Sequence, residues 1–398
     1  MPMDQSWMKL LGALVVVLPL SCGGDGDPRD PLAAAESELT DRRGRFAASV
    51  LAEVDLPFPA GIAAGRDVFF VGSPFEGRVI ALSRADGAML GELPPPPNGF
   101  ILPFIMKSVS GSRVAVLDAG GFPSPDPFVP ANPTIYEYEY RFGPHSEFRA
   151  RLVRSIPFDG AVIGFAEDAI RLDDGRYLLS DAVLGSIWIA ERDGTIRPGI
   201  VPETLSPEDA IPEMVFCDTM PVVEVGGVPF LFTDSAIPGV TALAERNGKV
   251  YFSGSCAGAV YSFPLSILDD SRAPHERAED IRPVSIKPHD VVVEELLGLT
   301  FNPFDRHDPY LYAADALQLR VIRIDPRNGR RSVVGDDPVL FNFPSSLAFA
   351  PPRECDKNTS TLFVLSNQQH LTPLLNDAIQ VDMLEPPFLA TQIQFRGH

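Results

Sequence analysis

Cysteine, basic residues and long apolar runs are all scarce in this chain of 398 residues, and each shortage excludes a class of protein. The 4 cysteines form no Cys-x-x-Cys pair, which argues against a structural zinc site. Lysine and arginine total 33 against 53 acidic residues, so the net charge is −20. The chain therefore lacks the basic footprint that nucleic acid or anionic lipid would require of a main partner. Beyond the first 20 residues, no apolar run is long enough for a transmembrane helix.

Familiar catalytic motifs are also missing. There is no Gly-x-Ser-x-Gly elbow, no His-Glu-x-x-His pair and no glycine-rich phosphate loop. The pairs His289-Asp290 and His307-Asp308 lie in proline-rich stretches, and we interpret them as surface loops. What the chain does have is 40 prolines and 32 glycines, which favour many turns and count against a helical protein.

The stretch Gly164–Pro198 predicts three short antiparallel strands joined by tight turns. Asp173-Asp174-Gly175 and Asp193-Gly194 are turn signals, and the run SIWIAER between them has apolar residues on both faces. A meander that is apolar on both faces must be covered on both sides, as a blade of a β-propeller is by its neighbours.

Similar units recur along the chain, and we count six. Barrel and sandwich folds also produce short strands with regular turns. The same order of strands and turns recurs in each unit, however, and this favours an all-β, six-bladed β-propeller of four-stranded antiparallel blades over residues 50–398. We expect the region Phe46–Leu56 to pair with the last blade and close the ring. The stretches Pro123–Pro133, Leu205–Pro238 and Asp269–His289 read as insertions, either lining a binding face or merely covering the propeller.

The first 22 residues are predicted to be an export signal. Lys9 precedes the apolar run Leu10–Leu20, and Cys22 stands where bacterial lipoproteins carry their acylated cysteine. Residues 23–49 then form a tether. We expect a monomer in the bacterial cell envelope, either periplasmic or attached to the outer membrane, whose contact with the membrane is the lipid on Cys22. The alternative is cleavage without an anchor, which would give a secreted protein. Among Cys217, Cys256 and Cys355 one disulfide is allowed, with Cys217–Cys256 preferred and the pairing left open.

The segments DDGRYLLSDAVLGSIWIAERDG and YLYAADALQLRVIRIDPRNG resemble the propellers of the SMP-30/gluconolactonase/paraoxonase superfamily, including its strictosidine synthase-like branch, and NHL repeats. The resemblance implies a central channel in which family enzymes hold calcium through a Glu, two Asn and an Asp. The matching positions here are Ala60, Glu167, the neighbourhood of Val240, and Leu297. Among these four, only Glu167 has a side-chain oxygen, so we expect no metal and no other cofactor.

Two functions remain open at this stage, and whether the protein is an enzyme is undecided. The first is binding of a small molecule or a protein at one propeller face, with Glu167 and Asp168 as the ligand-binding candidates. The second is a lactonase-like or esterase-like hydrolase, or a lyase, that acts in the channel without metal or with a diverged metal site. Glu167 would then be the catalytic base; the alternative is a channel carboxylate that accepts hydrogen bonds from backbone amides.

Two further patterns carry expectations. Asp118, Asp181 and Asp315 each end the second predicted strand of their blade and are expected to stabilise turns. In the run YEYEY, the three tyrosines are expected on one face of a strand, either as blade packing or as an aromatic ligand platform, with Glu137 and Glu139 facing water.

Overall fold

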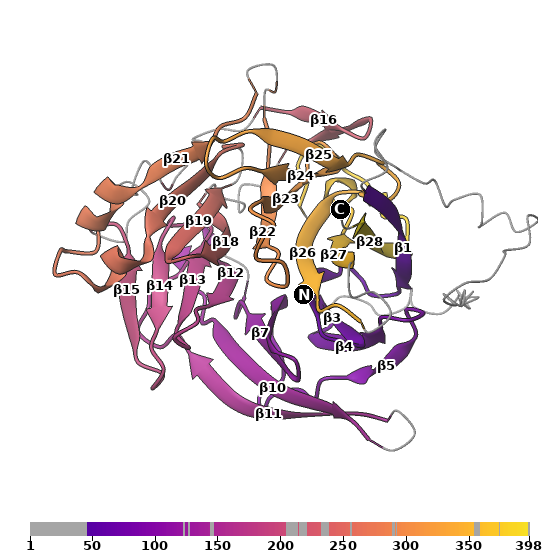
Figure 1. The fold of residues 1–398 in the computed structure, drawn as a ribbon, viewed down its shortest axis with the longest axis horizontal. Coiled ribbons are helices and arrows are strands. Elements are labelled where there is room, and N and C mark those ends of the chain that lie inside the picture. The colour runs from indigo at the N-terminus through magenta and orange to yellow at the C-terminus, as the bar shows by residue number, and fades with distance from the viewer. Residues whose placement is uncertain are drawn as a thin grey trace, which may run out of the picture.

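The computed structural model describes residues 46–396 except 122–123, 126–127, 144–146, 204–213, 215–220, 232–238, 255–256, 289–290, 292, 354–358 and 374. Six four-stranded antiparallel sheets surround a central axis, which confirms the six-bladed propeller (Figure 1). Blade A contains β2 (Ala60–Ala64), β3 (Val68–Ser73), β4 (Arg78–Ser83) and β5 (Met89–Glu92). Blade B contains β6 (Pro103–Ser110), β7 (Arg113–Asp118), β10 (Thr134–Phe142) and β11 (Phe148–Pro157). Blade C contains β12 (Ala166–Arg171), β13 (Tyr177–Asp181), β14 (Ile187–Ala190) and β15 (Ile196–Ile200).

The other three blades follow the same order around the ring. Blade D contains β18 (Val240–Arg246), β19 (Lys249–Gly254), β20 (Val260–Pro264) and β21 (Arg282–Ser285). Blade E contains β22 (Leu296–Phe301), β23 (Leu311–Asp315), β24 (Arg320–Ile324) and β25 (Arg331–Gly335). Blade F contains β26 (Pro344–Ala350), β27 (Thr359–Ser366), β28 (Phe388–Arg396) and β1 (Phe46–Val54). The lowest-numbered strand of blades A to E, and β26 in blade F, is the innermost.

Blade C shows why the sequence folds in this way. Gly175 and Gly194 adopt φ values of +91° and +95° in the two turns that the Asp-Gly signals predicted. All four residues of β14 are buried, because neighbouring blades cover both faces of the sheet. Apolar clusters accordingly lie between adjacent blades. The cluster around Trp188 and Phe165, for example, joins blade C to Leu117 and Ile135 of blade B.

The ring closes through the N-terminal strand. β1 pairs antiparallel with β28, with Phe46 opposite Phe395 and Val54 opposite Phe388. The expected closure by the region Phe46–Leu56 is therefore confirmed, and the first strand includes the last four residues of the predicted tether. Closure gives the last blade its fourth strand and pairs an edge that β28 would otherwise leave open.

Two strand expectations were wrong in detail. The sequence of the run AIQVDM, residues 378–383, predicts a strand of the last unit, but it forms turns and bends, and β28 supplies that strand instead. The stretch Asp269–His289 was expected as an insertion, but it contains β21, the fourth strand of blade D, after the short 3₁₀ helices η4 (Leu265–Asp269) and η5 (Glu276–Asp280). Residues 379–383 alternate apolar and polar side chains as a strand does, whereas β21 contains Pro283 and shows no clear alternation, so sequence periodicity assigned both segments wrongly.

The two ends of the blades carry different turns, and we call these ends the mouth face and the base face. The mouth face carries the turns between second and third strands and the connections between blades, and the base face carries the turns between first and second and between third and fourth strands. Insertions lie at both ends. The pair β8 (Ser124–Pro125) and β9 (Phe128–Val129) and the hairpin β16 (Val223–Val225) to β17 (Val228–Phe230) are at the mouth face, whereas η4 and η5 are at the base face.

Several predicted residues lie outside the described part of the chain. These are Cys22 with the export signal, the three other cysteines Cys217, Cys256 and Cys355, and the pair His289-Asp290. Within the part that the structure describes, no helix is long and apolar enough to cross a membrane.

Candidate functional site

The site is built by one irregularity that all six innermost strands share. In each blade, two residues of the first strand oppose a single residue of the second strand, near the mouth face. Such a bulge turns a side chain out of the ladder and bends the strand. The first residues of the six bulged pairs are Gly61, Phe104, Glu167, Thr241, Leu297 and Ser345, and all six line one cavity.

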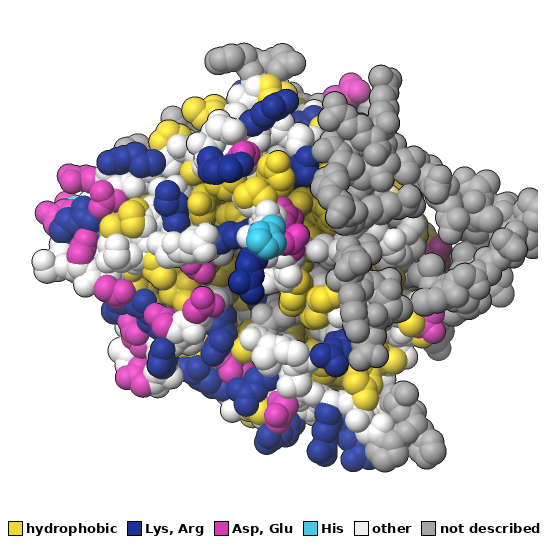
Figure 2. All heavy atoms as spheres, viewed as in Figure 1, with side chains coloured by type: hydrophobic (Ala, Val, Ile, Leu, Met, Phe, Trp, Pro, Cys, Tyr) yellow, Lys and Arg dark blue, Asp and Glu magenta, His cyan; other side chains and the backbone are white. Residues whose placement is uncertain are grey.

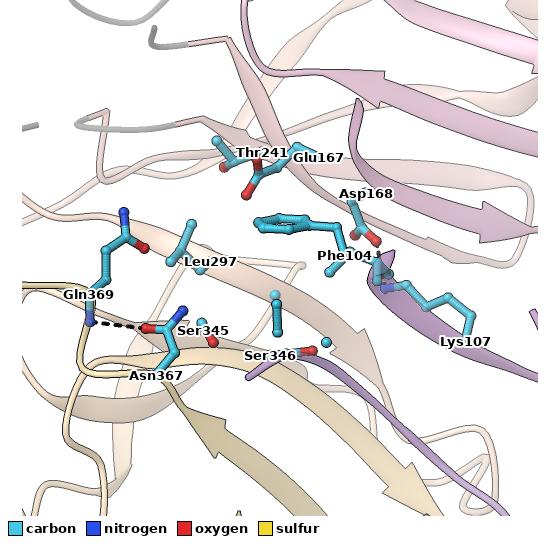
Figure 3. A pocket seen from close by; sticks show the side chains of 14 residues that line it. Phe104, Lys107, Glu167, Asp168, Thr241, Leu297, Ser345, Ser346, Asn367 and Gln369 are labelled. Carbon is cyan, nitrogen blue, oxygen red and sulfur yellow. Dashed lines mark hydrogen bonds and ion pairs between the residues drawn. The ribbon is translucent and has the colours of Figure 1, made fainter. Parts of the chain in front are cut away.

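This cavity lies where the six bulges converge around the channel (Figure 3). Its volume is about 30 Å³, enough for one or two water molecules and too small for a whole sugar or ester. Asn367 and Gln369, which follow β27 at the mouth face, complete the polar part of the lining. A ligand could therefore insert only a small polar group here, while the rest of it lay across the mouth.

Glu167 is the distinctive chemical group of the cavity. Enclosure by protein raises the pKa of its carboxyl to about 8, and the neighbouring carboxylate of Asp168 adds to this effect. At neutral pH most of the Glu167 side chains are therefore protonated, and the carboxyl can donate a hydrogen bond. Perturbed carboxyl groups in clefts are frequent at functional sites, although ion-pair networks can also perturb them.

Asp168 has a different role from its neighbour. Its buried carboxylate contacts the Lys107 ammonium of blade B at 2.8 Å. It also accepts hydrogen bonds from the backbone N–H of Ala169 at 2.8 Å and from that of Leu243 in blade D at 2.9 Å. One carboxylate thus links three adjacent blades beside the channel. The charges of Lys107 and Asp168 compensate each other, so with Glu167 protonated the described lining carries no net charge.

The calcium positions implied by the sequence resemblance can be compared with the bulge positions. Glu167 and Leu297 are the first residues of their bulged pairs. In blade A the first bulged residue is Gly61, one position after the matched Ala60, and in blade D it is Thr241, which lies within the matched neighbourhood of Val240. Calcium takes six to eight oxygen ligands, usually including several carboxylates.

The described lining does not fit calcium. It offers only two carboxyl groups, Glu167 and Asp168, and the Asp168 carboxylate is already paired with the Lys107 ammonium. The other side-chain oxygens are the hydroxyls of Thr241, Ser345 and Ser346 and the amides of Asn367 and Gln369, beside an aliphatic side chain and a glycine. No group of three or more His, Cys, Asp or Glu side chains suited to a metal occurs among the described residues.

Sequence reasoning missed part of the site. Phe104, Lys107, Thr241, Ser345 and Asn367 were not singled out, yet all five line the cavity. The signal that could have found Phe104, Thr241 and Ser345 is their position, because each follows the first residue of an innermost strand. The family pattern directed attention to four blades and so left blades B and F unexamined.

The three repeated aspartates do not share one role. Asp118 accepts hydrogen bonds from the backbone N–H groups of Ile101, Leu102 and Gly120, and Asp181 accepts from those of Gly164, Phe165, Val183 and Leu184, as expected for turn stabilisation. Asp315 instead pairs with Arg320 at 2.7 Å, beside the buried Glu294. Burial and the Glu294 carboxylate raise the pKa of Asp315 to about 8.

The expectation for YEYEY was partly wrong. Tyr138 and Tyr140 are buried in blade packing, whereas Glu137, expected in water, is 5% exposed. It accepts a hydrogen bond of 2.8 Å from the hydroxyl of Tyr177 in blade C. The reason is that blade C covers this face of β10, so both faces of the strand are buried. The other pair expected in a loop, His307-Asp308, lies between β22 and β23, with Asp308 accepting from the Tyr312 hydroxyl at 2.9 Å.

Comparison with known proteins places the fold. No protein-family model and no curated protein matches the chain. Among solved structures, a luciferin-regenerating enzyme is similar with a TM-score of 0.50 and 13% identity, over 88% of this chain and 95% of that one. The calcium-binding protein regucalcin from Agrobacterium tumefaciens str. C58 is similar with a TM-score of 0.50 and 14% identity, over 89% of this chain and 96% of that one. The chain shares its six-bladed β-propeller fold with these SMP-30/gluconolactonase-like proteins, at low sequence identity.

Proposed function

We propose that this protein is an exported, lipid-anchored β-propeller that binds a small, uncharged polar ligand at the mouth of its channel. The observation that carries the proposal is the state of Glu167, a channel carboxyl whose pKa is raised to about 8 inside an otherwise charge-compensated lining. A protonated carboxyl donates to carbonyl, ether or hydroxyl oxygens. The Thr241 and Ser345 hydroxyls and the Asn367 and Gln369 amides supply further donors and acceptors.

The lack of net charge selects the class of ligand. A cation would find no pair of free carboxylates, and an anion would find no free cation, because the Lys107 ammonium is already paired with Asp168. A ligand rich in carbonyl and hydroxyl oxygens, such as an uncharged sugar, lactone or ester, meets the described groups best.

A binding experiment tests this directly. Calorimetric titration with a panel of neutral, cationic and anionic small molecules should give binding only for neutral polar compounds. Glu167→Leu should abolish that binding, Glu167→Gln should weaken it less because the amide still donates, and Glu53→Gln on the exposed face of β1 should leave it unchanged. Selective binding of a cation, or unchanged binding in Glu167→Leu, would refute the proposal.

A second candidate function is a metal-independent hydrolase or lyase reaction in the channel. A pKa near 8 suits a group that gives or takes a proton at physiological pH, and this observation favours Glu167 as the acid or base. Turnover on a lactone and ester panel should then follow a titration near pH 8 and disappear in Glu167→Gln. Turnover that persists in this variant would exclude the role.

Export and anchoring rest on the N-terminal sequence. The apolar run Leu10–Leu20 is followed by Cys22, as in lipoprotein signals. Metabolic labelling with a radioactive fatty acid should mark the wild-type chain and spare Cys22→Ser. Equal labelling of both chains would contradict anchoring at this cysteine.

A further inference from the structure

Charge is divided between the two faces of the propeller. Every exposed lysine or arginine, among the residues whose exposure the structure describes, lies in, or close to, a base-face turn. These residues are Arg66, Arg113, Arg141, Arg149, Arg151, Arg171, Arg192, Lys249, Arg282, Arg306, Arg327 and Arg330. Figure 2 looks onto this face and shows basic side chains spread around it.

Carboxylates at the two faces show the opposite balance. At the mouth face the described exposed carboxylates outnumber the exposed cations, although Glu76 and Glu92 pair with Arg78, whose side chain is 38% exposed. These exposed carboxylates are Asp55, Glu76, Glu92, Asp159, Glu203, Glu224, Asp336, Asp377, Asp382 and Glu385. The base face also carries exposed carboxylates, but fewer than its exposed cations, and they are Asp67, Glu147, Asp173, Asp193, Asp269, Glu276 and Glu279. Three of its exposed arginines are ion-paired, Arg149 with Glu147, Arg151 with Glu139 and Arg327 with Asp325, and the other exposed cations still outnumber the exposed carboxylates. The net charge of −20 therefore conceals an acidic mouth face and a base face on which cations predominate.

The chain enters the fold at the basic end. Phe46, the first residue of β1, pairs with Phe395 near the end of β28, which runs from the mouth face to the base face. Arg42, Arg43 and Arg45 stand immediately before it in the sequence. Roughly 24 residues separate Cys22 from Phe46, and a flexible tether of that length has a typical end-to-end distance of about 27 Å.

We propose that the base face is a docking surface for the anionic phospholipid headgroups of the membrane that holds the lipid anchor. The proposal adds to the proposed anchoring, which would keep this face close to the bilayer at high effective concentration. A single acyl chain binds membrane only marginally, and a basic patch is the usual second signal. The channel mouth would consequently point away from the membrane, open to ligand.

The acidic mouth face does not prevent this docking. A strand of 6 residues such as β3 spans about 20 Å, more than twice the Debye length of about 8 Å at physiological ionic strength. Salt therefore screens the distant carboxylates from the bilayer, while each nearby cation contributes about fivefold to binding.

Vesicle flotation of a chain without the N-terminal lipid anchor tests whether the base face binds membrane by itself. A chain that begins at Gly23 retains β1 to β28 and hence the closed ring. It should float with vesicles of phosphatidylcholine containing phosphatidylglycerol at low salt, and should remain unbound with pure phosphatidylcholine or at high salt. The triple variant Arg66→Gln, Arg113→Gln, Arg306→Gln should bind on the order of a hundredfold more weakly.

A matched control distinguishes the effect of the base-face cations on vesicle binding from the effect of the net charge of the chain. Asn98→Glu, Val339→Glu and Gln380→Glu change exposed mouth-face residues and alter the net charge by the same amount as the base-face triple variant. This control should bind anionic vesicles nearly as well as the parent. Equal loss in both triple variants, equal binding to neutral vesicles, or no binding to anionic vesicles at low salt would each overturn the docking surface. Because the chain tested has no lipid, these outcomes do not depend on acylation of Cys22 or on ligand binding at Glu167.

Discussion

Replacing Glu167 with glutamine should stabilise the protein at neutral pH. The ordinary pKa of a glutamic acid is 4.5, and that of Glu167 in the folded chain is raised to about 8. As pH rises above 4.5, the unfolded chain releases this proton while the folded chain keeps it. Folding stability is therefore lost between pH 4.5 and 8, and the glutamine variant does not suffer this loss.

The size of the effect follows from the two pKa values. The difference in proton binding corresponds to about 3 kcal/mol at pH 7 and to less than about 1 kcal/mol at pH 5. Partial exposure to solvent lowers these figures, because the Glu167 side chain is only partly buried. We therefore expect Glu167→Gln to raise the free energy of unfolding by about 1–3 kcal/mol at pH 7 and by much less at pH 5.

Urea unfolding of both chains at pH 5, 6, 7 and 8 measures this difference. Subtracting the two curves cancels the titration of every other group, and Glu53→Gln, an exposed change in β1, should give a flat difference. A Glu167→Gln variant that is less stable than the parent at pH 7 would show that the carboxyl is ionised and held by hydrogen bonds in the folded state. A difference that does not change with pH would show that the pKa of Glu167 is the same in the folded and unfolded chains.

The remaining predictions concern the frame around the cavity. Asp168→Asn should lower the free energy of unfolding by about 3 kcal/mol, because Lys107 loses its buried partner; a loss equal to that of an exposed Asp67→Asn would contradict this. Asp181→Ala should lower the free energy of unfolding by about 3 kcal/mol, because four backbone N–H groups lose their acceptor. A loss below about 1 kcal/mol would refute the role of Asp181 in stabilising the turn. Gly61→Ala should lower the free energy of unfolding by about 2 kcal/mol or more, since φ is +65° and a Cβ would lie 2.5 Å from the Phe104 carbonyl oxygen. Gly99→Ala, whose Cβ would meet nothing within 4 Å, is the control, and an equal loss in both variants would contradict the steric reason. Urea unfolding measures all three.

The fold could be predicted from sequence because its signals are local. Asp-Gly turns and strands that are apolar on both faces, such as β14 between its turns, require only neighbouring residues to be recognised. The closing strand β1 was also predictable, because a ring of six blades needs a fourth strand for blade F. The segment 378–383 shows the limit: it reads as a strand by composition, and only tertiary pairing decides against it.

The site was less predictable, because it depends on contacts between blades. Glu167 was recognisable from its place at the start of β12, but the link from Lys107 to Asp168 joins residues 61 positions apart in different blades. The burial of Glu137 has the same origin, since Tyr177 of the next blade covers a face that alternation alone assigns to water. A one-residue bulge in each innermost strand also shifts positions along it, so that counting residues matched Ala60 where Gly61 is the first bulged residue.

The central claim is that the channel is a charge-compensated polar site built around a protonated Glu167, without the calcium ion that the family resemblance implies. Thermal unfolding at pH 7 with calcium or with EDTA tests it most directly, because an ion that binds only the folded chain must stabilise it. We predict the same melting temperature in both conditions, for the parent chain and for Glu167→Gln. A calcium-dependent rise in the melting temperature of the parent that disappears in Glu167→Gln would contradict the claim.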